Sequence, residues 1–160
     1  MSLETDVIST LNADSTLTSL LGANGDTKIY PIQSPIGSTA PYIVYNTPDD
    51  GTIEENLLEK VMFFDCIDSE WVDSNDIKER ISTLFDVEDK IRKVITSDDF
   101  RYFWCKLIGG TSFIDTDTQL LHDVVLFGFK YLSVDAGNFL LAEDGSFILT
   151  EDGGRIILEP

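Results

Sequence analysis

The stretch Leu120–Val134 constrains the fold of this chain more than any other part of the sequence. β-Branched and aromatic residues dominate it, and Gly128 lies in its middle, where it would weaken a helix. We therefore expect a long β-strand. Both sides of this strand are largely apolar, so both of its faces need cover. One side carries Leu121, Val125, Phe127, Phe129 and Tyr131, and the other carries Leu120, Val124, Leu126, Leu132 and Val134.

The remaining elements predict an α+β fold. Residues 41–46, 60–68 and 100–108 have the composition of strands, and Gly109-Gly110 is expected to end the last of them. Pro31 excludes residues 28–32 from a central strand position. Helices are expected over residues 4–21, with a second turn capped by Asp14 or Ser15, and over residues 73–95, capped by Asp73 or Ser74. The prediction is a mainly antiparallel four-stranded sheet with helices packed on one face.

Acidic and basic residues are paired along the second predicted helix. Each base follows an acid by four residues, a spacing that brings the two side chains together on one helix face. This pattern favours a solvated helix face over a phosphate-binding patch. The pairs are Asp76 with Arg80, Asp86 with Lys90, Glu88 with Arg92, and Asp89 with Lys93.

Two helical regions can cover one face of such a sheet, which leaves the second apolar face without cover. An exposed apolar surface of that extent is unusual on a monomer, so we expect neighbouring subunits to cover it. Alternation places Tyr102 and Trp104 on one side of the third predicted strand, and both are candidate interface residues.

Residues 135–160, here called the C-terminal extension, repeat with a period of eight. Asp144-Gly145 and Asp152-Gly153 predict hairpin turns, and folding on them gives a small three-stranded β-meander with one apolar face. Such a meander is too small to be stable alone, so we expect it to dock on domain 1–134 or on another protein. The candidate interface residues are Leu140, Phe147, Leu149, Ile156 and Leu158.

The chain is strongly acidic, with 29 acids against 11 bases, a net charge of −18 and a pI near 4.1. Such a surface repels nucleic-acid phosphates. The charge favours three interpretations: solubility, a surface that DNA slides past without adhering, or imitation of DNA. Neither a secretion signal nor a membrane span is visible, and Cys66 and Cys105 lie in apolar runs typical of buried thiols, so we expect a cytosolic protein.

Catalytic chemistry is not indicated. His122 is the only histidine, and no nucleophile motif lies near it. Asp115 and Asp117, near His122 and Asp123, lack the glycine and distal glutamate of a calcium loop. We expect no catalytic, cofactor or metal site and predict that the chain is not an enzyme.

Two short motifs give the chain a family resemblance. Ile29-Tyr30-Pro31 is followed about ten residues later by Pro41-Tyr42-Ile43-Val44-Tyr45, within the order helix, loop, strand, strand, helix, strand, long strand. Over residues 3–134 this resembles the tail completion, or tail terminator, proteins of long-tailed bacteriophages. The eight-residue repeats look like tails of phage structural proteins, whereas the long charged helix through Ile95 and the added meander depart from the family.

The resemblance implies a virion protein that assembles in the host cytoplasm into a hexameric ring. That ring caps the tail tube at its head-proximal end, contacts the tail tube protein and the neck or adaptor protein, and lets DNA pass through its lumen without specific binding. Six copies at −18 each would carry about −108, which suits such a channel. A head–tail adaptor or neck protein, and an acidic DNA-mimic inhibitor, are the alternatives.

Overall fold

The computed structural model describes residues 2–22, 28–48, 50–52, 57–86, 95 and 100–133. The helices in these ranges are α1 (Leu3–Ala13), α2 (Ser15–Leu20) and α3 (Trp71–Phe85). The strands are β1 (Ile29–Pro31), β2 (Tyr42–Asn46), β3 (Asp50–Thr52), β4 (Leu57–Asp68), β5 (Phe100–Ile114) and β6 (Leu121–Ser133). None of the helices in the described part of the chain has the length and apolarity needed to cross a membrane.

The strands form one sheet in the order β1-β2-β4-β6-β5, and β3 pairs with β4 outside this path. All pairings are antiparallel except that between β1 and β2. The four predicted strands are present, but the prediction of a four-stranded sheet was wrong because β1 and β3 join it. Pro31 lies in the edge strand β1, where its missing amide leaves no ladder bond unmade.

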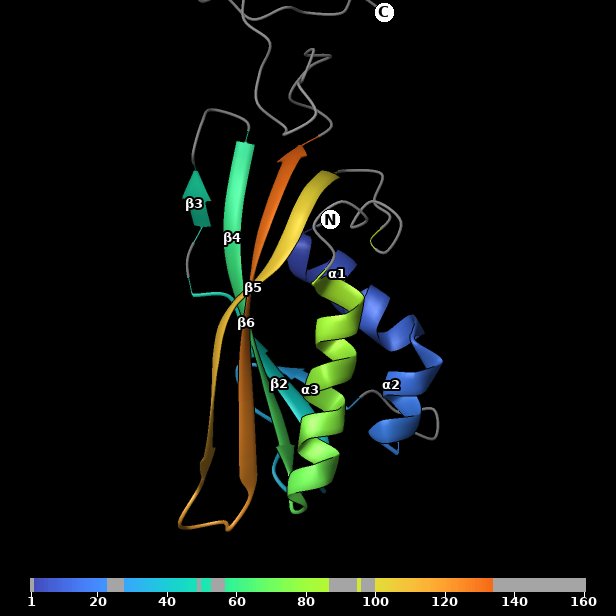
Figure 1. Ribbon diagram of the computed structural model, residues 1–160, viewed down its shortest axis with the longest axis vertical. Helices are drawn as coiled ribbons and strands as arrows, with labels where there is room; N and C mark the ends of the chain where they lie inside the picture. Colours follow the sequence, from blue (N-terminus) through green and yellow to red (C-terminus); the bar gives the residue numbers. More distant parts are fainter. Residues whose placement is uncertain are drawn as a thin grey trace, which may run out of the picture.

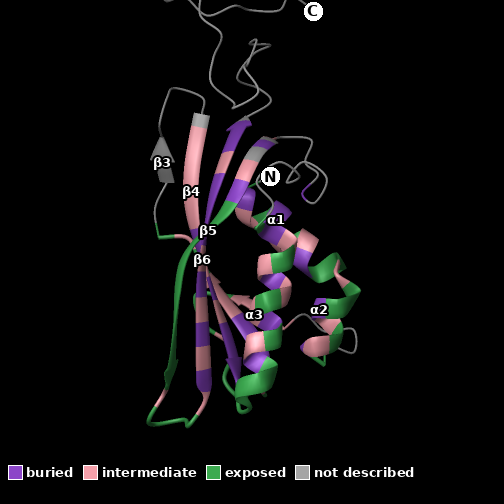
Figure 2. Ribbon diagram, in the orientation of Figure 1, coloured by how far each residue is buried: buried purple, intermediate pink, exposed green. Residues whose placement is uncertain are grey.

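The helices lie on one side of the sheet, as the sequence predicted (Figure 1). The core fills the space between these two layers (Figure 2). On β6 the helices cover the side that carries Leu121, Val125, Phe127, Phe129 and Tyr131, and all five side chains are buried. The inner side of β4 supplies Met62, Phe64 and Cys66, and Phe85 of α3 packs between Phe64, Phe127 and Phe129. Cys66 and Cys105 are free, buried thiols, as expected.

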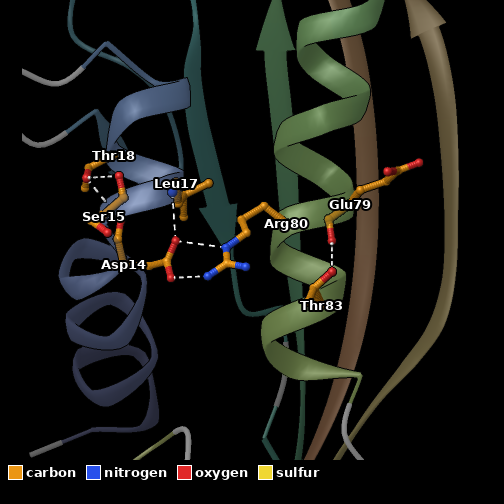
Figure 3. Close-up of polar contacts among 7 residues, drawn as sticks. All are labelled: Asp14, Ser15, Leu17, Thr18, Glu79, Arg80 and Thr83. Carbon is orange, nitrogen blue, oxygen red and sulfur yellow. Dashed lines mark hydrogen bonds and ion pairs between the residues drawn. The ribbon is translucent and has the colours of Figure 1, made fainter.

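The corner between α1 and α2 is built on Asp14. Its backbone ends α1, and its carboxylate caps α2 by accepting the Leu17 amide at 2.7 Å. The same carboxylate binds the guanidinium of Arg80 on α3 (Figure 3). The predicted cap at this position is therefore confirmed, but Arg80 pairs with Asp14 and not with Asp76, the partner expected from helical spacing. The other three predicted pairs involve residues outside the described ranges.

Helix α3 begins earlier and ends earlier than expected. Glu70 is its N-cap residue, so the prediction of Asp73 or Ser74 was wrong, and Ser74 is instead buried in the second turn. The helix ends at Phe85, and Asp86 closes it with a backbone amide that donates to the Ser82 carbonyl. Residues 87–94, where the helix was expected to continue, lie outside the described ranges.

Strand β5 departs from simple alternation at two bulges, between Tyr102 and Trp104 and between Leu107 and Gly109. A bulge adds one residue to a strand and shifts the side chains that follow to the opposite face. Tyr102 therefore lies on the helix side, whereas Trp104 pairs with Lys130 and lies on the other side. The prediction that Tyr102 and Trp104 share a face was wrong for this reason.

Candidate assembly surface

The side of the sheet opposite the helices, here called the helix-free face, is largely apolar. Cross-strand pairing between β4 and β6 places Phe63 beside Leu126, and Asp65 beside Val124, on this face. Helices α1, α2 and α3 all pack on the opposite side (Figure 2), so within the described residues no second layer covers it. Its half-buried apolar side chains are Val44, Val61, Phe63, Trp104, Val124 and Leu126.

A polar pair lies on the helix-free face near the β5–β6 turn. His122 Nδ1 is 2.8 Å from Asp65 Oδ2, and the ring of Phe113 stacks on the His122 ring at 4.7 Å and 9°. Asp65 Oδ1 is buried and has no protein partner. Burial raises the pKa of the Asp65 carboxyl, and the hydrogen bond to His122 opposes that rise. Asp65 and His122 therefore form a polar pair on an otherwise largely apolar face.

Most of the large apolar side chains that the structure exposes gather in two places. One is the second half of β5, where Ile108 is 51% and Ile114 57% exposed, and the other is the first turn of α3. Both belong to the end of the molecule that carries the β5–β6 turn (Figure 2). The residues are Trp71, Val72, Leu107, Ile108, Phe113 and Ile114.

The β5–β6 turn is fixed by its own polar side chains. The carboxylate of Asp115 accepts the Asp117 amide at 3.0 Å and the Thr118 hydroxyl at 2.7 Å. These bonds lower the pKa of Asp115. Among the described residues there is no group of three or more His, Cys, Asp or Glu side chains placed to hold a metal ion.

A groove of about 280 Å³ runs between α3 and β5. Next to the groove, and not part of its lining, Asp123 is fully buried and accepts hydrogen bonds from Ser74, Lys78 and Ser112. Burial alone would raise the pKa of Asp123, but the bonds from Ser112, Lys78 and Ser74 lower it. The three donors to this carboxylate come from α3 and β5, so Asp123 of β6 joins these elements beside the groove. The groove is lined by Lys78, Ser82, Leu107, Gly109, Gly110, Thr111, Ser112, Val124 and Val125.

The predicted interface residues fall into three groups. Tyr102 is 2% exposed, and its hydroxyl donates to Asp6 at 2.6 Å, so it belongs to the core of its own subunit. Trp104 lies on the helix-free face, where its ring packs beside Gly128: a Cβ atom at that glycine would lie 3.3 Å from the ring. The five candidates of the C-terminal extension lie outside the described residues.

The sequence missed the second half of β5. Gly109-Gly110 was expected to end the strand, but β5 continues through both glycines to Ile114. At Gly110 a Cβ atom would lie 2.6 Å from the backbone oxygen of Val124, so a glycine is needed there for close pairing with β6. The sequence feature that could have indicated this continuation is the run Thr111-Ser112-Phe113-Ile114, whose composition suits a strand.

Comparison with known proteins finds a solved structure with a similar fold but no matching family. No family of known proteins matches the sequence, and no curated protein matches it. The structure is similar to a chain from the "Virion of native gene transfer agent (GTA) particle", with a TM-score of 0.61 and 14% sequence identity. The match covers 82% of this chain and 95% of that chain. At this identity, what the two chains share is the fold.

Proposed function

We propose that this chain is a structural protein of a phage-like virion and that it acts as a tail terminator. In this role, copies of the chain form a ring that caps the tail tube. The fold shared with a chain of the gene transfer agent virion supports the virion role. The motifs around Tyr30 and Tyr42 support the terminator role through the family they resemble.

The observation that carries the proposal is the helix-free face. An apolar sheet face needs a second layer, because side chains such as Phe63 and Leu126 otherwise stay in contact with water. Assembly with further copies supplies that layer without any additional helix in the subunit. Closed rings of identical subunits arise when one surface of a copy contacts a different surface of the next copy.

The net charge fits a ring that DNA crosses. Each copy carries −18, so a ring concentrates negative charge around its lumen, and the lumen repels the phosphate backbone. Repulsion of this kind lets DNA pass without adhering to the wall. The proposed partners are further copies of the chain, the tail tube protein and the neck or adaptor protein.

Size-exclusion chromatography with light scattering, followed by electron microscopy of the purified chain, tests the ring. Six copies of 17.9 kDa predict a particle of about 107 kDa with a central hole. A monomer or dimer that competes with DNA for a basic protein would instead support the DNA-mimic interpretation.

Particles assembled without the protein test the role. Tails of uncontrolled length are the expected result, because a terminator stops tube growth. Tails of normal length that fail to join heads would contradict the terminator role and indicate an adaptor.

A further inference from the structure

Strand β5 is the last strand of the sheet, so one of its edges has no neighbouring strand among the described residues. The backbone amide of Leu107 points away from β6 and donates to the Asp86 side chain at 3.4 Å. Unpaired amides and carbonyls along a strand are a template for another strand. Beyond Leu107, whose amide already donates to Asp86, the edge of β5 is therefore able to accept an extended segment.

Natural proteins protect such edges with charges or prolines, because unprotected edges pair with other chains. Residues 107–114 of β5 contain neither a charged residue nor a proline. The opposite edge of the sheet differs, since β1 has only three residues and includes Pro31. In a chain with a charge of −18, residues 108–114, beyond the Asp86 carboxylate at Leu107, carry no charge of their own and include exposed Ile108 and Ile114. This segment suits contact with a second copy, because fewer like charges meet there.

The groove beside this edge has room for side chains of an added strand. Gly109 and Gly110 form part of its wall, and a Cβ atom at Gly109 would have no neighbour within 4 Å. In strand addition the backbone bonds provide affinity, and a pocket for alternate side chains provides specificity. The groove and the free edge therefore form one acceptor site.

The C-terminal extension has the composition of the added strand. It contains the uncharged apolar runs Phe139–Ala142, Phe147–Thr150 and Ile156–Leu158. Two other occupants of this edge are less suitable. Strand β1 of a second copy has only three residues and is too short to pair along residues 107–114. Strand β5 of a second copy would pair symmetrically and close a dimer instead of a ring.

The length of the chain after β6 permits contact with a second copy. Residues 134–160 span roughly 89–97 Å when fully extended. Strand β6, with 13 residues, spans roughly 43 Å. The extended segment is about twice the length of β6, so it is long enough to reach beyond its own copy.

We propose that the free edge of β5 from Leu107 to Ile114, with the groove beside it, binds the C-terminal extension of a second copy of this chain. Each copy donates one extension and accepts another, so the contact repeats around a ring. This contact rests on the proposed ring and names the surface that links its subunits.

Two full-length variants test the contact. Ile108→Asp adds a charge to the acceptor edge, at a side chain that is 51% exposed, and Leu149→Asp adds a charge to the donor segment. Each variant alone should be a monomer of 17.9 kDa by light scattering, a sixfold drop from the ring. Ile36→Asp, at a fully exposed loop residue, and Ser146→Asp, directly after the predicted turn Asp144-Gly145, are controls that should keep the ring. Circular dichroism of each variant verifies that it is folded.

Mixing the two variants distinguishes exchange between copies from docking within one copy. The intact extension of Ile108→Asp should bind the intact edge of Leu149→Asp, giving a one-to-one dimer of about 36 kDa, twice 17.9 kDa. A mixture that stays monomeric contradicts exchange between copies. If either single variant still forms a ring, the proposed contact at the β5 edge is wrong, but the proposed ring is retained. A monomeric unaltered chain overturns the proposed ring.

Discussion

Arg80 holds Asp14 through both oxygens of its carboxylate, with Nε 3.0 Å from Oδ1 and Nη2 2.5 Å from Oδ2 (Figure 3). Oδ1 also accepts the amide of Leu17 at the start of α2. One side chain therefore caps a helix and joins the α1–α2 corner to α3. A planar guanidinium suits this geometry because it offers two parallel donors to a carboxylate.

Replacing each partner separates these two roles. Arg80→Ala removes the ion pair and should lower the free energy of unfolding by about 1 kcal/mol, because the pair is only partly buried. Asp14→Ala also removes the cap and should cost about 1 kcal/mol more. Urea denaturation measures both. Equal losses in the two variants would contradict the capping role of Asp14.

Tyr102→Phe tests the buried bond between β5 and α1. The Tyr102 hydroxyl donates to Asp6, which is 6% exposed, and the loss of this donor leaves a buried carboxylate with one partner fewer. The variant should lower the free energy of unfolding by about 1.5–3 kcal/mol, the range for bonds to charged groups. Thermal unfolding checks it, and an unchanged melting temperature would show that the bond does not stabilise the fold.

Adjacent glycines in β5 should respond differently to alanine. Gly110→Ala places a Cβ against the Val124 carbonyl and should cost about 1–3 kcal/mol, because the β5–β6 pairing must shift. Gly109→Ala meets no atom within 4 Å and should change stability by about 0.5 kcal/mol or less. Chemical denaturation of both variants measures the difference. Equal effects would contradict the close strand pairing at Gly110.

Stability should fall in acid. Burial would raise the pKa of Glu4, but hydrogen bonds led by that from Lys60 lower it from 4.5 to about 2. The pKa values of Asp14 and Asp123 are lowered too. A carboxyl whose pKa is lower in the folded state stabilises the fold above its unfolded value, and this contribution is lost as the pH falls through the folded value. Asp65 acts in the opposite direction, because its pKa is raised.

Melting temperatures measured from pH 5 to pH 2 check this dependence. The melting temperature of the unaltered chain should decrease over that range. Glu4→Gln should make the decrease shallower, because it removes the group whose pKa is lowered to about 2. A melting temperature that rises toward pH 2 would contradict the assignment of these carboxylates as stabilising.

Much of the fold follows from local pattern. Alternation over Leu121–Tyr131 predicted which side chains of β6 share a face, and Pro31 excluded β1 from a central position in the sheet. Which of the two faces of β6 the helices cover did not follow from alternation. The bulges in β5 were not predictable, because they depend on pairing with β6 and reverse the alternation between Tyr102 and Trp104.

The candidate surface was predictable only in part. An apolar second face followed from the composition of the strands, but the free edge of β5 depends on strand order, which alternation does not encode. The partner of Arg80 was not predictable from local spacing either. Helical spacing favoured Asp76, whereas the packing of α3 against the α1–α2 corner brings Asp14 within reach of Arg80.

The mass of the purified full-length chain, measured by light scattering at physiological salt, tests the central claim most directly. A hexameric ring predicts about 107 kDa, six times 17.9 kDa. A single species of 17.9 kDa at every concentration would contradict assembly through the helix-free face and the β5 edge.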